Sequence, residues 1–115
     1  MSRVAGFQAE ALARSYLTEQ GLTWVASNYT CRLGEIDLIM REGAFLVFIE
    51  VRARTSLAFG GGAASVTYSK QQKILKTAAY YLMVNKLQDK CPTRFDVLSL
   101  DGMPPQVTWI KDAFN

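Results

Sequence analysis

The spacing of the hydrophobic residues predicts two helices in this chain. Val4–Gln20 is rich in Ala, Leu, Gln and Glu, which favour helix, and a glycine follows it. A second helix is expected to begin near Thr67 or Ser69 and to end near Leu87, with Ser69 and Gln72 forming a capping box. The apolar positions that recur at helical spacing in it are Ile74, Leu75, Ala78, Tyr81 and Leu82. Both segments should therefore bury one face.

Five shorter segments have the composition and periodicity of β-strands. They are Thr23–Thr30, Glu35–Met40, Phe45–Arg54, Phe95–Leu100 and Val107–Ile110. Phe45–Arg54 is apolar on both faces in its first half, so we expect it in the centre of the sheet. Side-chain alternation in the second segment places Ile36, Leu38 and Met40 on one face. A long helix between two strands predicts an α/β fold with a mixed sheet and helices on its faces.

Composition narrows the class of protein. The chain has 115 residues, of which 50% are hydrophobic, and this suits a single domain over residues 1–115. Its longest apolar run, Ala44–Ile49, is far shorter than the roughly 20 residues of a membrane span. The first residues also lack the apolar stretch of a signal peptide. We therefore expect a cytoplasmic protein that does not enter a membrane.

Two absences exclude whole classes of site. There is no histidine, which rules out Ser-His-Asp and Cys-His triads and imidazole metal ligands. Cys31 and Cys91 have no CxxC spacing, so neither a zinc knuckle nor a thioredoxin-type site is expected. Gly60–Gly62 lacks the lysine and the Ser or Thr of a phosphate-binding loop, and we interpret it as an ordinary loop. Any acid–base or metal chemistry must therefore rely on carboxylates, Lys, Tyr, water and oxygen-ligated cations.

Two acidic residues stand out on the predicted strands. Asp37 and Glu50 are 13 positions apart, and a hairpin turn at Arg41–Gly43 would bring them side by side. Two carboxylates on one side of a sheet repel each other unless a cation lies between them, and Mg²⁺ suits such oxygen ligands. Glu10 on the first helix would complete this metal site. Arg52 would place a positive charge beside it, where a phosphate group needs one.

A structural alternative explains the same two acids. In it, Asp37 and Glu50 form ion pairs with nearby arginines and bind no metal. The candidate partners are Arg52, Arg54 and Arg94. Spacing alone does not distinguish this alternative from the metal site.

Basic residues are concentrated in one part of the chain. Val51–Gln88 contains six basic residues and no acidic one, although the net charge of the whole chain is only +3. Such a window is typical of a surface that binds a polyanion, but on charge alone a solvated helix face explains it better. Trp24 and Trp109 are interpreted as core or rim aromatics rather than as platforms on which bases stack.

Several motifs taken together resemble a known family. They are Gly34-Glu35-Ile36-Asp37, Phe48-Ile49-Glu50-Val51-Arg52, Lys70-Gln71 and Arg94-Phe95-Asp96-Val97, with Glu10 on the first helix. This set is similar to that of the YraN-like family. That family in turn resembles PD-(D/E)xK nucleases of the restriction-endonuclease-like fold, especially archaeal Holliday junction resolvases. The resemblance spans nearly the whole chain and implies one endonuclease-like domain.

The resemblance also implies roles for individual residues. Asp37 matches the first acid of the nuclease signature and Glu50 the second, and Glu10 matches the helix-borne acid of the resolvases. Gln71, or alternatively Lys70, matches a polar residue on the following helix. The metal that these residues would hold is Mg²⁺ or Mn²⁺, with ligands Asp37, Glu50 and Glu10.

Arg52 departs from the signature, which has lysine at this position. Lysine can lose its proton and help to activate water, whereas arginine is always protonated in proteins. Arg52 could still position water or neutralise phosphate. The departure puts one assumed catalytic role in question.

The function that the resemblance implies is metal-dependent cleavage of DNA, including branched DNA. The catalytic residues would be Asp37, Glu50, Arg52 and Gln71. The residues expected to contact DNA are Arg54, Lys70, Lys73 and Lys76. The analogy with resolvases also suggests a homodimer. Two alternatives keep the scaffold without catalysis: a DNA-binding module, and an interaction subunit of a DNA-processing complex.

Overall fold

The computed structural model of the chain describes residues 3–54 and 66–115, so the predicted loop at Gly60–Gly62 lies outside the described residues. In chain order the elements are α1 (Arg3–Glu19), β1 (Thr23–Cys31), β2 (Gly34–Glu42), β3 (Phe45–Arg54), α2 (Tyr68–Val84), β4 (Thr93–Asp101) and β5 (Gln106–Ile110). The order of helices and strands is the one predicted, with boundaries that differ by a few residues. Neither helix is long and apolar enough, over the ranges described, to cross a membrane.

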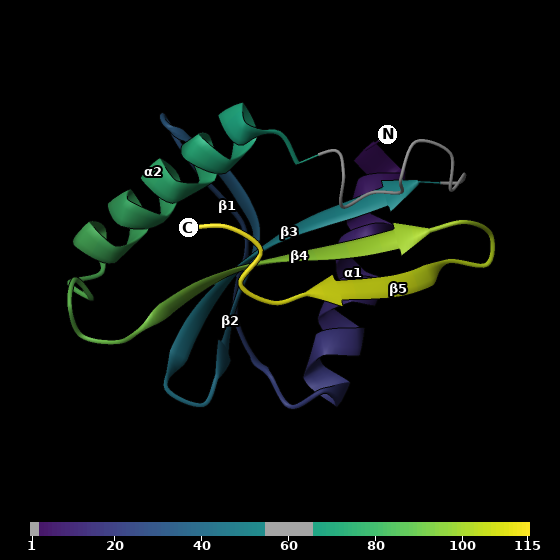
Figure 1. Ribbon diagram of the computed structural model, residues 1–115, viewed down its shortest axis with the longest axis horizontal. Coiled ribbons are helices and arrows are strands. Elements are labelled where there is room, and N and C mark those ends of the chain that lie inside the picture. Colours follow the sequence, from purple (N-terminus) through teal and green to yellow (C-terminus); the bar gives the residue numbers. More distant parts are fainter. Residues whose placement is uncertain (1–2, 55–65) are drawn as a thin grey trace.

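The strands form one mixed sheet in the order β1-β2-β3-β4-β5. β3 and β4 run parallel, and every other neighbouring pair is antiparallel. Parallel neighbours need a long crossover connection, which here includes α2 (Figure 1). β3 lies in the centre, as its apolar sequence predicts. The α/β fold with a five-stranded mixed sheet flanked by two helices is therefore confirmed, and it is compatible with a restriction-endonuclease-like fold.

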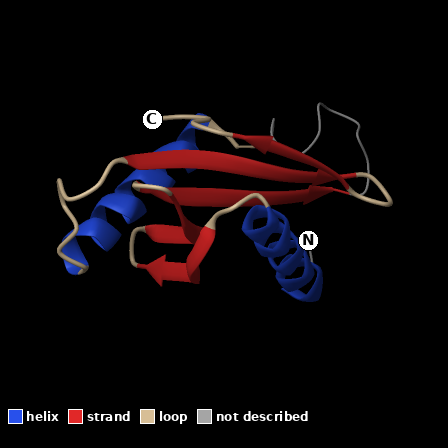
Figure 2. Cartoon of the chain, turned by 90° about the horizontal axis from the view of Figure 1, so that it is seen from below, coloured by secondary structure: helices blue, strands red, loops and turns tan. Residues whose placement is uncertain are grey.

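Each helix covers one face of the sheet. On the α1 side, Ala13 and Leu17 pack with Ile49 of β3. On the α2 side, Tyr81 packs with Phe48 of the same strand. Figure 2 shows α1 beneath the strands. Because consecutive side chains of a strand point to opposite faces, the even-numbered positions of β3 face α2 and the odd-numbered ones face α1.

The boundaries of α2 correct the sequence prediction. The N-cap is Thr67, not Ser69: Thr67 has an extended backbone, and its side chain accepts a hydrogen bond from the N–H of Lys70 at 3.2 Å. Ser69 already lies inside the helix, so it cannot cap it. The helix ends at Val84 rather than near Leu87, because Asn85 leaves the helical conformation and its side chain bonds back to a helix carbonyl.

The alternation of side chains in β2 breaks at Asp37, which the sequence did not predict. Leu38 and Met40 pack on the α1 side. Ile36, which should share their face, packs instead with Ile39 on the α2 side. Pairing of β2 with β3 begins only at Leu38, so the strand can rotate about its axis before that residue. The break therefore coincides with the candidate site.

Candidate functional site

Asp37 of β2 and Glu50 of β3 lie side by side. The antiparallel pairing places Leu38 opposite Ile49, so Asp37 and Glu50 are the next facing residues beyond the last paired rung. Their carboxyl groups are close enough that the charge of Asp37 raises the pKa of Glu50. Two carboxyl groups this close cannot both ionise without strong repulsion, so one of them keeps its proton to a higher pH than an isolated acid does. The structure thus brings together the two acids that the spacing indicated.

The backbone of the neighbouring strand holds Asp37 in place. The N–H of Val51 donates a hydrogen bond to Oδ2 of Asp37 at 2.8 Å. The carboxylate occupies the place of a backbone acceptor, which explains why regular β2–β3 pairing stops here. Burial raises the pKa of Asp37, and the hydrogen bond from Val51 only partly opposes this effect. Sequence reasoning missed this contact, because any residue at position 51 supplies the same N–H.

Glu50 is the group of the pair that retains the proton. Its side chain is only 11% exposed. Burial, followed by the charge of Asp37, raises the pKa of Glu50 to about 7, while the charges of Arg52 and Lys70 act in the opposite direction. The carboxyl group is therefore poised between its neutral and its charged form near neutral pH.

Arg52 faces Glu50 from two positions further along the same strand. Nη2 of Arg52 lies 3.1 Å from Oε1 of Glu50. Nε and Nη2 of Arg52 are nonetheless buried and make no hydrogen bond with any residue that the structure describes. The guanidinium group thus has donors left over after its ion pair, and an anionic ligand could use them.

Glu10 of α1 is not part of the carboxyl pair. Its carboxylate is half-buried and accepts a hydrogen bond from the side chain of Asn28 on β1. Burial raises the pKa of Glu10, and the charges of Asp37 and Glu35 raise it further, whereas Asn28 lowers it. No three acidic or cysteine side chains in the described ranges lie close enough together to form a metal-binding cluster. Of the three predicted metal ligands, Asp37 and Glu50 are thus neighbours on adjacent strands, and Glu10 stands apart from them.

The two candidate residues at the start of α2 have different surroundings. Nε2 of Gln71 donates to the carbonyl of Val66 at 3.1 Å, so its amide is engaged by the segment before the helix. Lys70 is exposed, and its charge lowers the pKa of Glu50. Lys70, not Gln71, is thus the helix residue whose effect on the carboxyl pair is evident.

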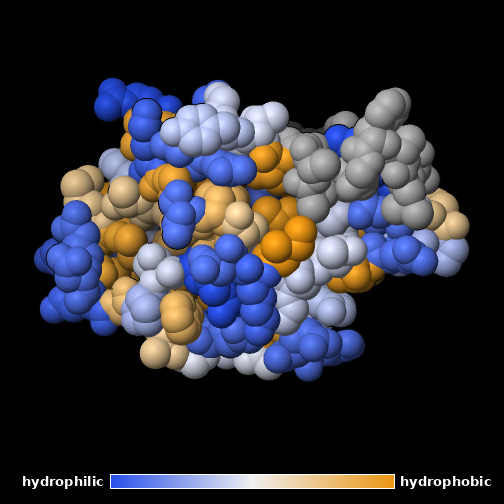
Figure 3. All heavy atoms as spheres, in the orientation of Figure 1, coloured by the Kyte–Doolittle hydropathy of each residue, from blue (hydrophilic) through white to orange (hydrophobic). Residues whose placement is uncertain are grey.

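The other basic residues expected to bind DNA lie around this site. Lys73 and Lys76 are exposed on α2, and Arg54 is half-buried at the end of β3. Figure 3 shows hydrophilic side chains along the α2 side of the molecule, interrupted by apolar groups. These three residues border the face of the sheet from which Glu50 projects.

The structural alternative considered Arg94 as an ion-pair partner of Asp37 or Glu50. In the structure Arg94 binds two other acids, Asp96 and Glu42. Its guanidinium binds both carboxylate oxygens of Asp96 at 2.9 Å and Oε1 of Glu42 at 2.7 Å. Asp96 is fully buried and also accepts hydrogen bonds from Nε1 of Trp109 and the N–H of Asp112. The charge of Arg94 is therefore used in a structural network. Of the arginines proposed as partners, Arg52 is the one for which an ion pair with the carboxyl pair is found.

Comparison with known proteins identifies the family. The family model described as "Uncharacterised protein family UPF0102" matches residues 9–100. A UPF0102 protein of Legionella pneumophila (strain Corby) is 56% identical over 115 residues, covering 100% of this chain and 98% of the relative. One from Saccharophagus degradans is 53% identical over 110 residues, covering 96% and 92%. One from Lachnoclostridium phytofermentans is 44% identical over 113 residues, covering 98% and 94%. The resemblance to the YraN-like family is thereby confirmed, and the chain belongs to the UPF0102 family.

Proposed function

We propose that this protein is a metal-dependent endonuclease that hydrolyses phosphodiester bonds in DNA. The observation that carries the proposal is the contact between the carboxyl groups of Asp37 and Glu50 on adjacent strands. Burying two acids against each other is unfavourable, and a fold that needed only stability would replace one of them. The pair therefore points to a ligand that compensates for the repulsion.

A hard divalent cation fits this pair. Both donors are carboxylate oxygens, which Mg²⁺ and Mn²⁺ prefer, and Mg²⁺ is commonly held by one or two carboxylates with water and phosphate. The raised pKa of Glu50 shows that the charges of the two carboxyl groups are not fully compensated. A bound cation would compensate them and displace the proton of Glu50. Asp37 and Glu50 would hold the ion, and Glu10 would support it through its charge. When bound, such an ion stabilises charge on the phosphate and lowers the pKa of water.

Arg52 would neutralise the phosphate. Its guanidinium stays charged throughout the reaction, and it has buried donors that no described residue uses. These donors suit the phosphoryl oxygens, on which negative charge grows in the transition state. Arg52 cannot accept the proton of the attacking water, so its contribution in this proposal is positioning and charge.

The basic side chains on the same side would hold the DNA backbone. Lys70 adds positive charge directly beside Glu50, and its neighbours extend the basic surface away from the site. Those neighbours are Arg54, Lys73 and Lys76. Contacts of this kind bind phosphates without reading sequence.

A nicking assay tests the proposal. Supercoiled plasmid and a four-way junction would be incubated with the purified protein and Mn²⁺, with EDTA as the metal-free control. We expect cleavage with Mn²⁺ by the wild type and none by Asp37→Asn or Glu50→Gln. Asp89→Asn, which changes an exposed acid between α2 and β4, should retain activity. Activity that survives Asp37→Asn would contradict this site. DNA binding without any cleavage would favour the non-catalytic DNA-binding module.

A further inference from the structure

A polar groove with a volume of about 520 Å³ lies between α1 and β1. The polar residues that line it are Glu10, Arg14, Ser15, Thr18, Glu19 and Ser27. None of these except Glu10 has a role in the proposed cleavage site. The groove is therefore a second candidate binding surface that shares one residue with the first.

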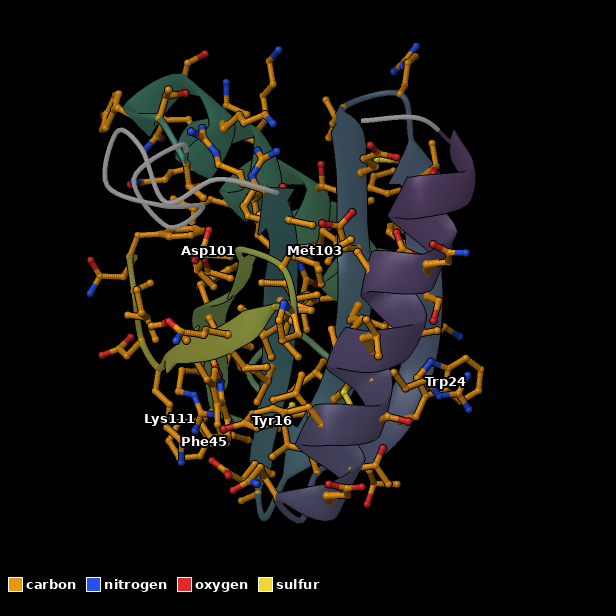
Figure 4. All side chains as sticks on the ribbon, turned by 90° about the vertical axis from the view of Figure 1, so that its right-hand side faces the viewer. Tyr16, Trp24, Phe45, Asp101, Met103 and Lys111 are labelled. Carbon is orange, nitrogen blue, oxygen red and sulfur yellow. The ribbon has the colours of Figure 1, made fainter. Side chains whose placement is uncertain are left out.

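Trp24 contacts two of the residues that line this groove, Arg14 and Ser27. Its side chain is on the surface, 40% exposed, and in Figure 4 it points outward beside α1. Nε1 of Trp24 donates to Oγ of Ser27 at 2.9 Å, and the guanidinium carbon of Arg14 lies 4.1 Å from the centre of the ring. Both contacts hold the indole in one orientation, while Trp109 is half-buried against the α1-side core. Both tryptophans are interpreted from the sequence as core or rim aromatics. In the structure Trp24 lies on the surface, and Trp109 packs against the core.

The charges of the groove select against phosphate. Glu10 and Glu19 contribute two carboxylates, against the single positive charge of Arg14. The hydroxyl groups of the lining can donate or accept, and the carboxylates accept only. A planar, uncharged ring with N–H donors suits such a lining, and a nucleobase has this chemistry. The guanidinium of Arg14 lies over one face of the Trp24 ring, so the opposite face of the indole is the one on which a base can stack.

Glu10 connects the groove to the carboxyl pair. Its carboxylate lines the groove, and the charge of Asp37 contributes to its raised pKa. Asn28 holds the Glu10 side chain by a hydrogen bond. A nucleotide whose base lies in the groove would therefore lie closer to Asp37 than to Glu50, which projects from the α2 side of the sheet.

We propose that the groove between α1 and β1 binds an unpaired nucleobase of the DNA substrate. This inference rests on the proposed function and specifies its substrate class. A base in a duplex is stacked and paired, and its extrusion costs a few kcal/mol. The preferred substrate is therefore DNA with unpaired nucleotides, such as a single-stranded overhang, a flap or a branch.

Metal-free binding tests the inference separately from cleavage. Binding of two labelled DNA duplexes, one blunt and one with a single-stranded overhang, would be measured in EDTA by fluorescence anisotropy of the label, with tryptophan emission recorded in parallel. We expect the overhang to bind more tightly than the blunt duplex, since a stacked base is worth about 1–3 kcal/mol, and to quench the tryptophan emission of the wild type through Trp24. Trp24→Ala should weaken binding of the overhang roughly 5- to 150-fold and leave binding of the blunt duplex unchanged. Trp24→Phe, which keeps a ring, should recover much of the affinity.

Tyr80→Ala is the matched control, because Tyr80 is 39% exposed but lies on α2. It should bind both duplexes like the wild type. Equal binding of the overhang by Trp24→Ala and the wild type would overturn the inference, even if the protein cleaves DNA. Quenching of Trp24 by spermidine but not by the overhang would also overturn it, because the groove would then take a cation. Binding to the overhang through Trp24 without any cleavage would support the groove and contradict the nuclease proposal alone.

Discussion

The backbone N–H of Val51 donates a hydrogen bond to the carboxylate of Asp37 at 2.8 Å, across the point where β2 and β3 cease to pair. This single hydrogen bond fixes an acid in front of Glu50 and ends the regular ladder. The N–H of Val51 would be left without this acceptor if the side chain at position 37 were shortened, and an unpaired buried donor is costly. Variants at position 37 should therefore keep a side-chain oxygen that accepts the hydrogen bond from Val51.

Metal binding should stabilise the fold through this pair. Millimolar Mg²⁺ or Mn²⁺ should raise the melting temperature of the wild type, because a ligand that binds only the native state stabilises it. Asp37→Asn should lose this response while retaining the hydrogen bond from Val51, since an amide oxygen also accepts. Differential scanning fluorimetry measures both.

Asp89→Asn is the control for this experiment and should respond to metal like the wild type, because Asp89 is exposed and lies between α2 and β4, outside the proposed site. A melting temperature of the wild type that does not change with Mn²⁺ would speak against the proposed metal site. So would a full response in Asp37→Asn.

The stability of the metal-free protein should fall as the pH rises from about 4.5 to about 7. Folded Glu50 keeps its proton up to about pH 7, whereas its ordinary pKa is 4.5. Between these values the unfolded state binds fewer protons than the folded state, so the free energy of unfolding decreases with pH. The loss should be at most about 3 kcal/mol, because one pKa unit corresponds to about 1.36 kcal/mol.

Glu50→Gln should flatten this part of the profile and be more stable than the wild type at pH 7.5 in EDTA. Urea denaturation at a series of pH values gives the free energies directly. The assignment to Glu50 is wrong if the variant retains the slope of the wild type.

The variant Arg52→Lys distinguishes between two roles of the positively charged side chain at position 52 of β3. If cleavage needs a group that can release a proton and direct water, Arg52→Lys should nick plasmid faster than the wild type. If it needs only a permanent charge that binds phosphate, the variant should be equal or slower, because arginine binds phosphate with two parallel hydrogen bonds. We expect the first result.

Arg52→Ala sets the lower limit of the same assay and should be the slowest of the three proteins. Nicking in Mn²⁺ at matched protein concentration decides between the two roles. Activity of Arg52→Ala equal to that of the wild type would show that Arg52 has neither role.

DNA binding should depend on the basic side chains around the site. In Arg54→Ala/Lys73→Ala/Lys76→Ala, the slope of log affinity against log salt should be shallower by up to about 0.9 for each duplex phosphate that the variant can no longer neutralise. Fluorescence anisotropy at several salt concentrations measures the slope. Lys86→Ala/Lys90→Ala, two exposed lysines beyond α2, should leave it unchanged. A triple variant with the wild-type slope would identify the basic window as a solvated surface.

Asp96 should be essential for stability rather than for activity. It is fully buried and accepts hydrogen bonds from Arg94, Trp109 and the N–H of Asp112. Asp96→Ala should lower the free energy of unfolding by about 3–5 kcal/mol, because it leaves a buried charge without its main partner. The urea midpoint measures this loss. Thr108→Ala, an exposed change on β5 next to Trp109, should cost less than about 0.5 kcal/mol.

The elements and the fold class could be predicted from the amino-acid sequence, because they depend on local periodicity. The apolar run in β3 predicted its central place, and the helix between β3 and β4 predicted their parallel pairing. The same period of two, combined with a tight turn, predicted that Asp37 and Glu50 face each other. Each of these relations is set by a few neighbouring residues.

The contacts that the side chains of the site make became visible only in the folded protein. Gln71 turns to the carbonyl of Val66, and Glu10 binds Asn28 rather than joining the carboxyl pair. Ile36 packs on the α2 side although simple alternation assigns it to the other face. These outcomes depend on contacts between residues that are far apart in the chain or on backbone groups that every residue carries. Periodicity carries no information about long-range contacts or about backbone groups. The contacts of the site are therefore established only when the strands and helices pack together.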